Sequence, residues 1–153
     1  GASHYSSVLY SIPNALCQIF DCYKPISMTE FSEKIAILPN GQVKYLTDKY
    51  DAISKTLGLK VSVRISDFKA IEAAILKNKS YTELENLSEI ARKNYPKSML
   101  ADYELGLMYE KNGETKKAAK AYQKASQFEE IGDLSKDMML EKFDEMQSLT
   151  PKK

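Results

Sequence analysis

The sequence predicts an all-α fold built from stacked antiparallel helix pairs, and three observations lead to this prediction. Apolar residues recur at steps of three and four through most of the 153 residues, which is the helical period. Six glycines and five prolines are too few for the many tight turns of an all-β fold. Two consecutive pairs of helical segments also superpose when the chain is shifted by about 34 residues, a period typical of helical repeats.

The composition excludes several classes of function. The chain carries 22 Lys and Arg against 21 Asp and Glu, for a net charge of +1. This balance argues against a nucleic-acid-binding surface, which usually shows a strong basic excess. Two cysteines and one distant histidine do not make a zinc pattern, so we expect neither a metal nor a cofactor. The sequence has no apolar run of about 18 residues to span a membrane and no recognisable signal peptide, and it leaves the cellular compartment open.

The first predicted helix lies within residues 6–23, where apolar residues follow the helical period. We expect it to begin near Ser11, with Pro13 in its first turn, and to end before the next proline. Cys17 and Cys22 would point in different directions on such a helix, which favours two free thiols over a disulfide.

Two helices and an extended segment are predicted next. Ser27 is followed three residues later by an acid, the signature of a capped helix start, and this helix should run until the turn at 39–41. A second helix is predicted over 42–57, with Gly58 as its C-cap. Residues 59–66 alternate apolar and polar side chains. Because the chain offers this segment no partner strand, we expect an extended linker instead of a strand.

The remaining chain is predicted to form five helices separated by short breaks. Asp67 is the predicted cap of the first of these helices, together with the serine before it. In the last helix, Leu134, Met138, Leu140 and Met146 are the candidates for burial. The predicted helices span 67–78, 81–94, 97–111, 114–128 and 134–148.

The repeat resembles a known family. Segment 99–132 matches the tetratricopeptide pattern W-x2-L-G-x2-Y…A-x3-F…P through Leu105-Gly106-x2-Tyr109 and Ala118-x3-Tyr122. The resemblance implies stacked helix pairs in a right-handed superhelix, in which the small residues let the paired helices approach and the tyrosines fill the space beside them. The residues predicted to specify this packing are Leu105, Gly106, Tyr109, Ala118, Tyr122 and Ala125.

The chain also departs from that pattern. Asp102 stands where the consensus has Trp, and Glu130 where it has the closing Pro. The earlier copy, 65–98, has Glu72 in place of the glycine and Ser88 in place of the aromatic residue. We therefore predict one good repeat and one degenerate repeat, followed by a capping helix that shields the last apolar face.

A second resemblance lies at the N-terminus, in the runs SHYSSV (3–8) and SIPNAL (11–16) and the pair Ile19-Phe20. These residues resemble the end of the catalytic domain of esterases of the esterase D type, which are α/β-hydrolases. In that family the histidine of the catalytic triad lies in an H-x-S-V-like loop before the last helix, and some bacterial members continue into a tetratricopeptide-like helical tail. The resemblance implies that His4 is the triad base of a parent serine esterase. The extra residue between His4 and the Ser-Val pair departs from the family's loop.

The resemblance also implies a division of the chain. Residues 1–25 would be a remnant of the last loop and helix of a catalytic domain, 26–66 a helical linker region, and 67–150 the tetratricopeptide-like domain. The nucleophile of such an esterase needs a G-x-S-x-G turn, which these 153 residues do not contain. We therefore do not expect this chain alone to be an enzyme.

Two functions are compatible with these features. The first is a non-catalytic C-terminal helical domain of an esterase, which packs on its own upstream catalytic domain, forms a homodimer or binds another protein. The alternative is a free-standing tetratricopeptide-like adaptor for protein–protein interaction, and in either case the repeats can serve as scaffold alone. If a binding groove exists, its candidate residues are Tyr103, Tyr109 and Lys116.

The missing nucleophile gives a direct test. The purified chain should hydrolyse a p-nitrophenyl ester no faster than buffer does, because a triad base without its serine cannot form an acyl-enzyme. Release of p-nitrophenol, followed by absorbance, is the measurement. Hydrolysis that disappears in the His4→Ala variant would contradict the prediction.

Overall fold

The structure, a computed structural model, describes residues 23–149. Within this range all regular secondary structure is helical, so the predicted all-α fold is confirmed. The predicted helix over 6–23, which contains Cys17 and Cys22, lies outside the described residues apart from its last position. His4, which precedes this helix, also lies outside them. The elements are α2 (Met28–Glu30), the π-helical turn η1 (Phe31–Ile35), α3 (Gln42–Leu57), α4 (Ile65–Asn78), α5 (Glu83–Asn94), α6 (Leu100–Lys111), α7 (Thr115–Ala125) and α8 (Lys136–Ser148).

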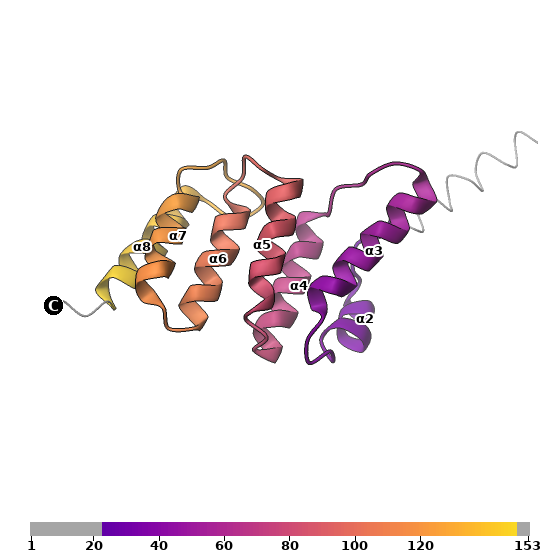
Figure 1. Cartoon of the computed structure of the whole chain (residues 1–153), viewed down its shortest axis with the longest axis horizontal. Coiled ribbons are helices and arrows are strands. Elements are labelled where there is room, and N and C mark those ends of the chain that lie inside the picture. Colours follow the sequence, from indigo (N-terminus) through magenta and orange to yellow (C-terminus); the bar gives the residue numbers. More distant parts are fainter. Residues whose placement is uncertain (1–22, 150–153) are drawn as a thin grey trace, which may run out of the picture.

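The helices form a row in which each packs against its neighbours (Figure 1). Helices α4 and α5 make one antiparallel pair, α6 and α7 make the next, and α8 packs against α7 at the end of the row. The predicted stack of antiparallel helix pairs with a C-terminal capping helix is therefore confirmed.

One hydrophobic core runs through the described chain. It extends from Ile35 in η1, through Leu46 and Tyr50 in α3 and Phe68 in α4, to Met146 in α8. Helix α3 packs against α4 and α5, so the region predicted as a linker, 26–66, shares its core with the repeats.

The tightest helix contact joins α6 to α7. A Cβ atom placed on Gly106 would lie 2.5 Å from a ring carbon of Tyr122, which is closer than any real side chain tolerates. Tyr122 is fully buried, and its hydroxyl donates a hydrogen bond to Glu110 at 2.5 Å. The other predicted packing residues surround this contact: Ala118 and Ala125 are fully buried, and Leu105 and Tyr109 are half-buried.

The helix that begins after Ser27 is shorter than predicted. Ser27 caps it as expected, because the Glu30 N–H donates to the Ser27 hydroxyl at 3.1 Å. The helix nevertheless ends at Ile35, although its pattern predicted a helix up to the turn at 39–41. Pro39 disfavours helical backbone at the residue before it. The chain instead forms a turn, with the Leu38 N–H donating to the Ile35 carbonyl at 3.1 Å and the Asn78 side chain donating to the carbonyl groups of residues 36 and 38.

Asp67, which was predicted to be a helix cap, is buried and links three segments of the chain. Helix α4 begins at Ile65, two residues before the predicted start, and Asp67 lies inside its first turn with no exposed surface. Its carboxylate accepts hydrogen bonds from the Ile26 N–H at 3.0 Å and from the Tyr50 hydroxyl at 2.8 Å. This one side chain therefore ties together α4, α3 and the segment before α2.

The extended segment before α4 is held by side chains, and no strand of the described chain pairs with it. The Val63 N–H donates to the side-chain oxygen of Asn94 at 3.0 Å, and the Tyr95 hydroxyl donates to the Val63 carbonyl at 2.7 Å. The predicted extended linker is confirmed over 59–64, whereas its last two residues, 65 and 66, belong to α4.

The buried face of α8 differs from the prediction by one residue. Met139 is fully buried, whereas Leu140 is 46% exposed. Ser135 caps the helix by accepting a hydrogen bond from the Met138 N–H at 3.2 Å. This cap starts the helix at Lys136, and Met139 and Met146, seven residues apart, lie on its buried face.

The contact between α6 and α7 predicts a loss of stability. Gly106→Ala should lower the free energy of unfolding by about 1–3 kcal/mol, because the added methyl group overlaps the Tyr122 ring. Urea unfolding followed by circular dichroism measures the change. In the Tyr122→Leu background the same substitution should cost less, because the ring it strikes is gone. Equal losses in both backgrounds would show that the contact does not limit this packing.

Candidate functional site

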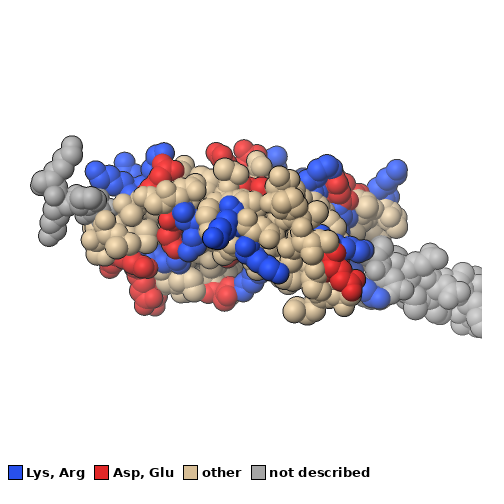
Figure 2. Space-filling model, turned by 90° about the horizontal axis from the view of Figure 1, so that it is seen from below, with Lys and Arg blue, Asp and Glu red and all other residues tan. Residues whose placement is uncertain are grey.

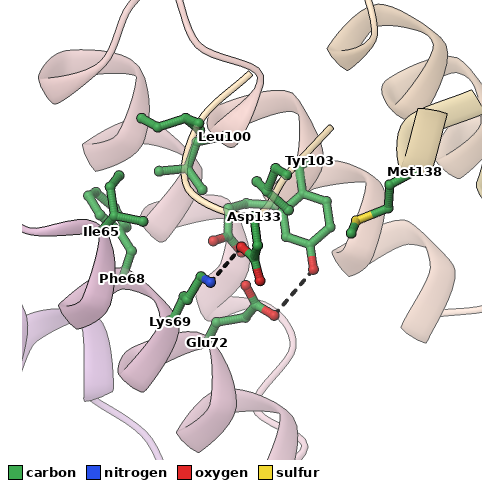
Figure 3. A pocket seen from close by; sticks show the side chains of 11 residues that line it. Ile65, Phe68, Lys69, Glu72, Leu100, Tyr103, Asp133 and Met138 are labelled. Atoms are coloured by element: carbon green, nitrogen blue, oxygen red, sulfur yellow. Dashed lines mark hydrogen bonds and ion pairs between the residues drawn. The ribbon is translucent and has the colours of Figure 1, made fainter. Parts of the chain in front are cut away.

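A pocket lies on the side of the stack where α4, α6 and α8 meet (Figure 3). It encloses about 220 Å³. Helices α4 and α6 are the first helices of consecutive pairs, and they contribute equivalent faces to the pocket. The lining residues are Ile65, Phe68, Lys69 and Glu72 from α4; Leu100, Tyr103 and Glu104 from α6; Ile131, Asp133 and Leu134 from the α7–α8 connection; and Met138 from α8.

The connection between α7 and α8 closes one side of this pocket. It is held to the start of α6, because the Met99 N–H donates to the Glu129 carbonyl and the Glu129 N–H donates to the Lys97 carbonyl, both at 2.9 Å. Gly132 then turns the chain with a φ of +62°, and a Cβ at this position would lie 3.0 Å from the side chain of Ile65. The connection is thus packed directly on α4.

Glu104 is the most unusual residue of the pocket. Its side chain is fully buried, and neither carboxylate oxygen has a hydrogen-bond partner in the part of the chain that the structure describes. Burial raises its pKa well above the ordinary value, and the nearby carboxyl group of Glu72 adds to the increase. In the free pocket, Glu104 therefore holds its proton to a higher pH than an exposed glutamate does.

Glu72 is a second acid in the same pocket. Its carboxylate points toward the Tyr103 hydroxyl, which donates a hydrogen bond to it at 3.3 Å (Figure 3). Burial raises the pKa of Glu72, and the hydrogen bond from Tyr103 partly opposes that increase. Burial also raises the pKa of Tyr103, so its hydroxyl group remains a neutral donor.

An exposed ion pair lies beside the two acids. Lys69 and Asp133 point toward each other, with 2.5 Å between the ammonium nitrogen and a carboxylate oxygen (Figure 3). This contact lowers the pKa of Asp133. The ion pair contributes little to stability because it is exposed to solvent. It does, however, direct the cation of Lys69 to the rim of the pocket, away from Glu104.

The polar residues that line the pocket are Lys69, Glu72, Tyr103, Glu104 and Asp133. Its lining contains no serine, cysteine or histidine to act as a nucleophile or its base. Within residues 23–149, no three His, Cys, Asp or Glu side chains are grouped to hold a metal ion, and no helix is long and apolar enough to cross a membrane. The face shown in Figure 2 carries basic and acidic side chains interspersed over its whole length.

The structure separates the three predicted groove residues. Tyr103 lines the pocket. Tyr109 lies six residues further along α6, on a different face, with the Lys117 ammonium 5.3 Å from its ring centroid. Lys116 is exposed at the turn between α6 and α7. The position predicted for the triad base, His4, is outside the described residues.

Sequence reasoning missed both pocket acids. Glu72 was noted only as a departure from the repeat pattern, and Glu104 was not singled out. The available signal was spacing, because Glu104 lies four residues after Leu100 and four before Met108, on a stripe of buried positions. An acid in such a stripe indicates a buried carboxylate.

Comparison with known proteins identifies one similar structure and no family. No protein family matches the sequence, and no curated protein matches it. The crystal structure of an uncharacterised protein from Capnocytophaga ochracea DSM 7271 is similar, with a TM-score of 0.82 and 34% sequence identity. The match covers 97% of this chain and 41% of that protein. The chain therefore spans less than half the length of its structural neighbour.

The burial of Glu104 predicts a pH-dependent stability. Near pH 4.5 and below, both the folded and the unfolded chain hold the proton, but above that pH the unfolded chain releases it while the folded chain retains it. Folding stability should therefore fall as the pH rises from about 4.5. Each unit by which the folded pKa exceeds the unfolded one costs about 1.4 kcal/mol.

The Glu104→Gln variant isolates this effect, because an amide of the same shape does not titrate. Its free energy of unfolding relative to the parent chain should increase between pH 4 and pH 7, as measured by urea unfolding. Glu141→Gln, at an exposed position of α8, is the matched control and should follow the parent chain. A constant difference between Glu104→Gln and the parent across this range would contradict the assignment.

Proposed function

We propose that this chain is a non-catalytic helical domain of a larger hydrolase of the esterase D type, and that it binds a protein segment through the α4–α6–α8 pocket. The segment belongs either to the hydrolase domain of the same polypeptide or to a separate partner. The pocket is the observation that carries the binding role, because equivalent faces of consecutive helix pairs form it and the helices alone do not fill it.

Two observations support a larger parent protein. The N-terminal runs around His4 resemble the end of an esterase catalytic domain. The structural neighbour from Capnocytophaga ochracea extends well beyond the matched region, since the match covers 41% of it. The uncharacterised neighbour supports a longer architecture and gives no indication of its activity.

The alternative function is a free-standing adaptor that binds a partner peptide through the same pocket. It is favoured by the same stack of helix pairs and requires no hydrolase domain. The coding sequence upstream of Gly1 separates the two proposals. We expect it to encode a domain with a G-x-S-x-G turn, and a start codon directly before Gly1 would rule out the esterase parent.

A pair of substitutions on α8 tests the binding role. The upstream domain, expressed separately, should bind this chain in isothermal titration calorimetry. Met138→Lys should weaken that binding at least tenfold, because Met138 lines the pocket and the new ammonium group would compete for its acids. Leu140→Lys is the matched control on the same helix, outside the pocket and already 46% exposed. Equal affinities for the two variants would place the contact elsewhere.

A further inference from the structure

The buried carboxyl group of Glu104 indicates which ligand chemistry suits the pocket. Removing a carboxylate from water is costly unless a cation or hydrogen-bond donors replace the water. Within the described residues the side chain of Glu104 has neither. Two cations lie close enough to lower the pKa of Glu72, but Lys69 pairs with Asp133 at 2.5 Å and Lys142 with Glu110 at 3.0 Å, and neither donates to Glu104.

Glu72 reinforces this preference. The carboxyl group of Glu72 raises the pKa of Glu104, and a cation bound between the two groups would favour the ionised form of both. The Tyr103 hydroxyl donates a hydrogen bond to one oxygen of Glu72 (Figure 3). An anionic ligand would instead place a further negative charge beside Glu72 and would keep Glu104 protonated.

The walls of the pocket suit a ligand with an apolar stem. Phe68 and Leu100 are buried apolar residues of the pocket, and Met138 lines it from the α8 side. A long basic side chain combines these properties, since its methylene groups pack on apolar surface while its head carries the charge. Between the two basic side chains, the planar guanidinium of arginine offers five donors and can engage two carboxylates at once.

We propose that the pocket binds the guanidinium group of an arginine side chain from the partner segment, with Glu104 and Glu72 as its acceptors and the apolar wall around its stem. This inference rests on the proposed function, because it names the chemistry of the segment that the α4–α6–α8 pocket binds. The same pocket chemistry applies whether the arginine belongs to the hydrolase domain or to a separate partner.

Small probes test the inference without the partner. N-acetyl-arginine methylamide should bind the 153-residue chain at neutral pH, as followed by methyl resonances in NMR titrations. The resonance of Met138, which lines the pocket, should shift, while that of the buried Met139 should change little. N-acetyl-citrulline methylamide has nearly the same shape without the charge, and it should bind at least tenfold more weakly.

Variants locate the charge that recognises the probe. Glu104→Gln and Glu72→Gln should each weaken binding of the arginine probe at least tenfold, and the exposed control Glu141→Gln should not change it. Unchanged methyl dispersion in the NMR spectrum shows that each variant is folded. Equal binding of the arginine and citrulline probes, or unchanged binding to both pocket variants, would overturn the inference.

The arginine proposal can fail while the proposed binding role of the pocket holds, and the experiments distinguish the two cases. Suppose that Met138→Lys abolishes partner binding but the arginine probe does not bind. The pocket would then remain a docking site, and arginine would be rejected as its ligand. Preference for N-acetyl-lysine methylamide over the arginine probe would likewise reject the guanidinium assignment.

Discussion

The close contact between Gly106 and the ring of Tyr122 is the constraint on which the second half of the structure depends. It fixes the separation of α6 and α7, and the hydrogen bond from the Tyr122 hydroxyl to Glu110 holds the ring in place. Helix α8 packs on α7 through Met139 and Met146, and the connection between them reaches back over α4. The pocket is lined by α4, α6, this connection and α8.

Buried acids serve two different purposes in this chain. Asp67 and Asp102 are both almost fully buried, and both are satisfied: Asp67 by hydrogen bonds from two other segments, and Asp102 by Lys124 at 2.9 Å and by Arg92 at 3.2 Å. Through these hydrogen bonds and ion pairs the two side chains hold neighbouring helices together. Glu104 has no such partners among the described residues, although it lies in the same helix as Asp102. This contrast within one fold is the observation behind our proposal that an external group completes Glu104.

The sequence predicted the elements of the fold better than it predicted the side chains that matter at the site. Helix 42–57 has the predicted bounds because a regular apolar stripe ends at Gly58, whose left-handed backbone stops the helix. Periodicity predicted the existence of α8 but not which of its residues face inward, since that depends on how the helix packs against α7. The burial of Asp67 depends on helices that are distant in the sequence, and for Glu104 the one local signal was its place on a stripe of buried positions.

The central claim is that the α4–α6–α8 pocket binds a cationic side chain. A structure of the chain with an arginine-containing ligand tests it most directly. The account predicts a guanidinium group within hydrogen-bonding distance of the Glu104 carboxylate, with the ligand's methylene groups along the apolar wall of the pocket. A bound ligand that leaves the pocket unoccupied and contacts another surface would contradict the account, as would an apolar group of the ligand in the place assigned to the guanidinium.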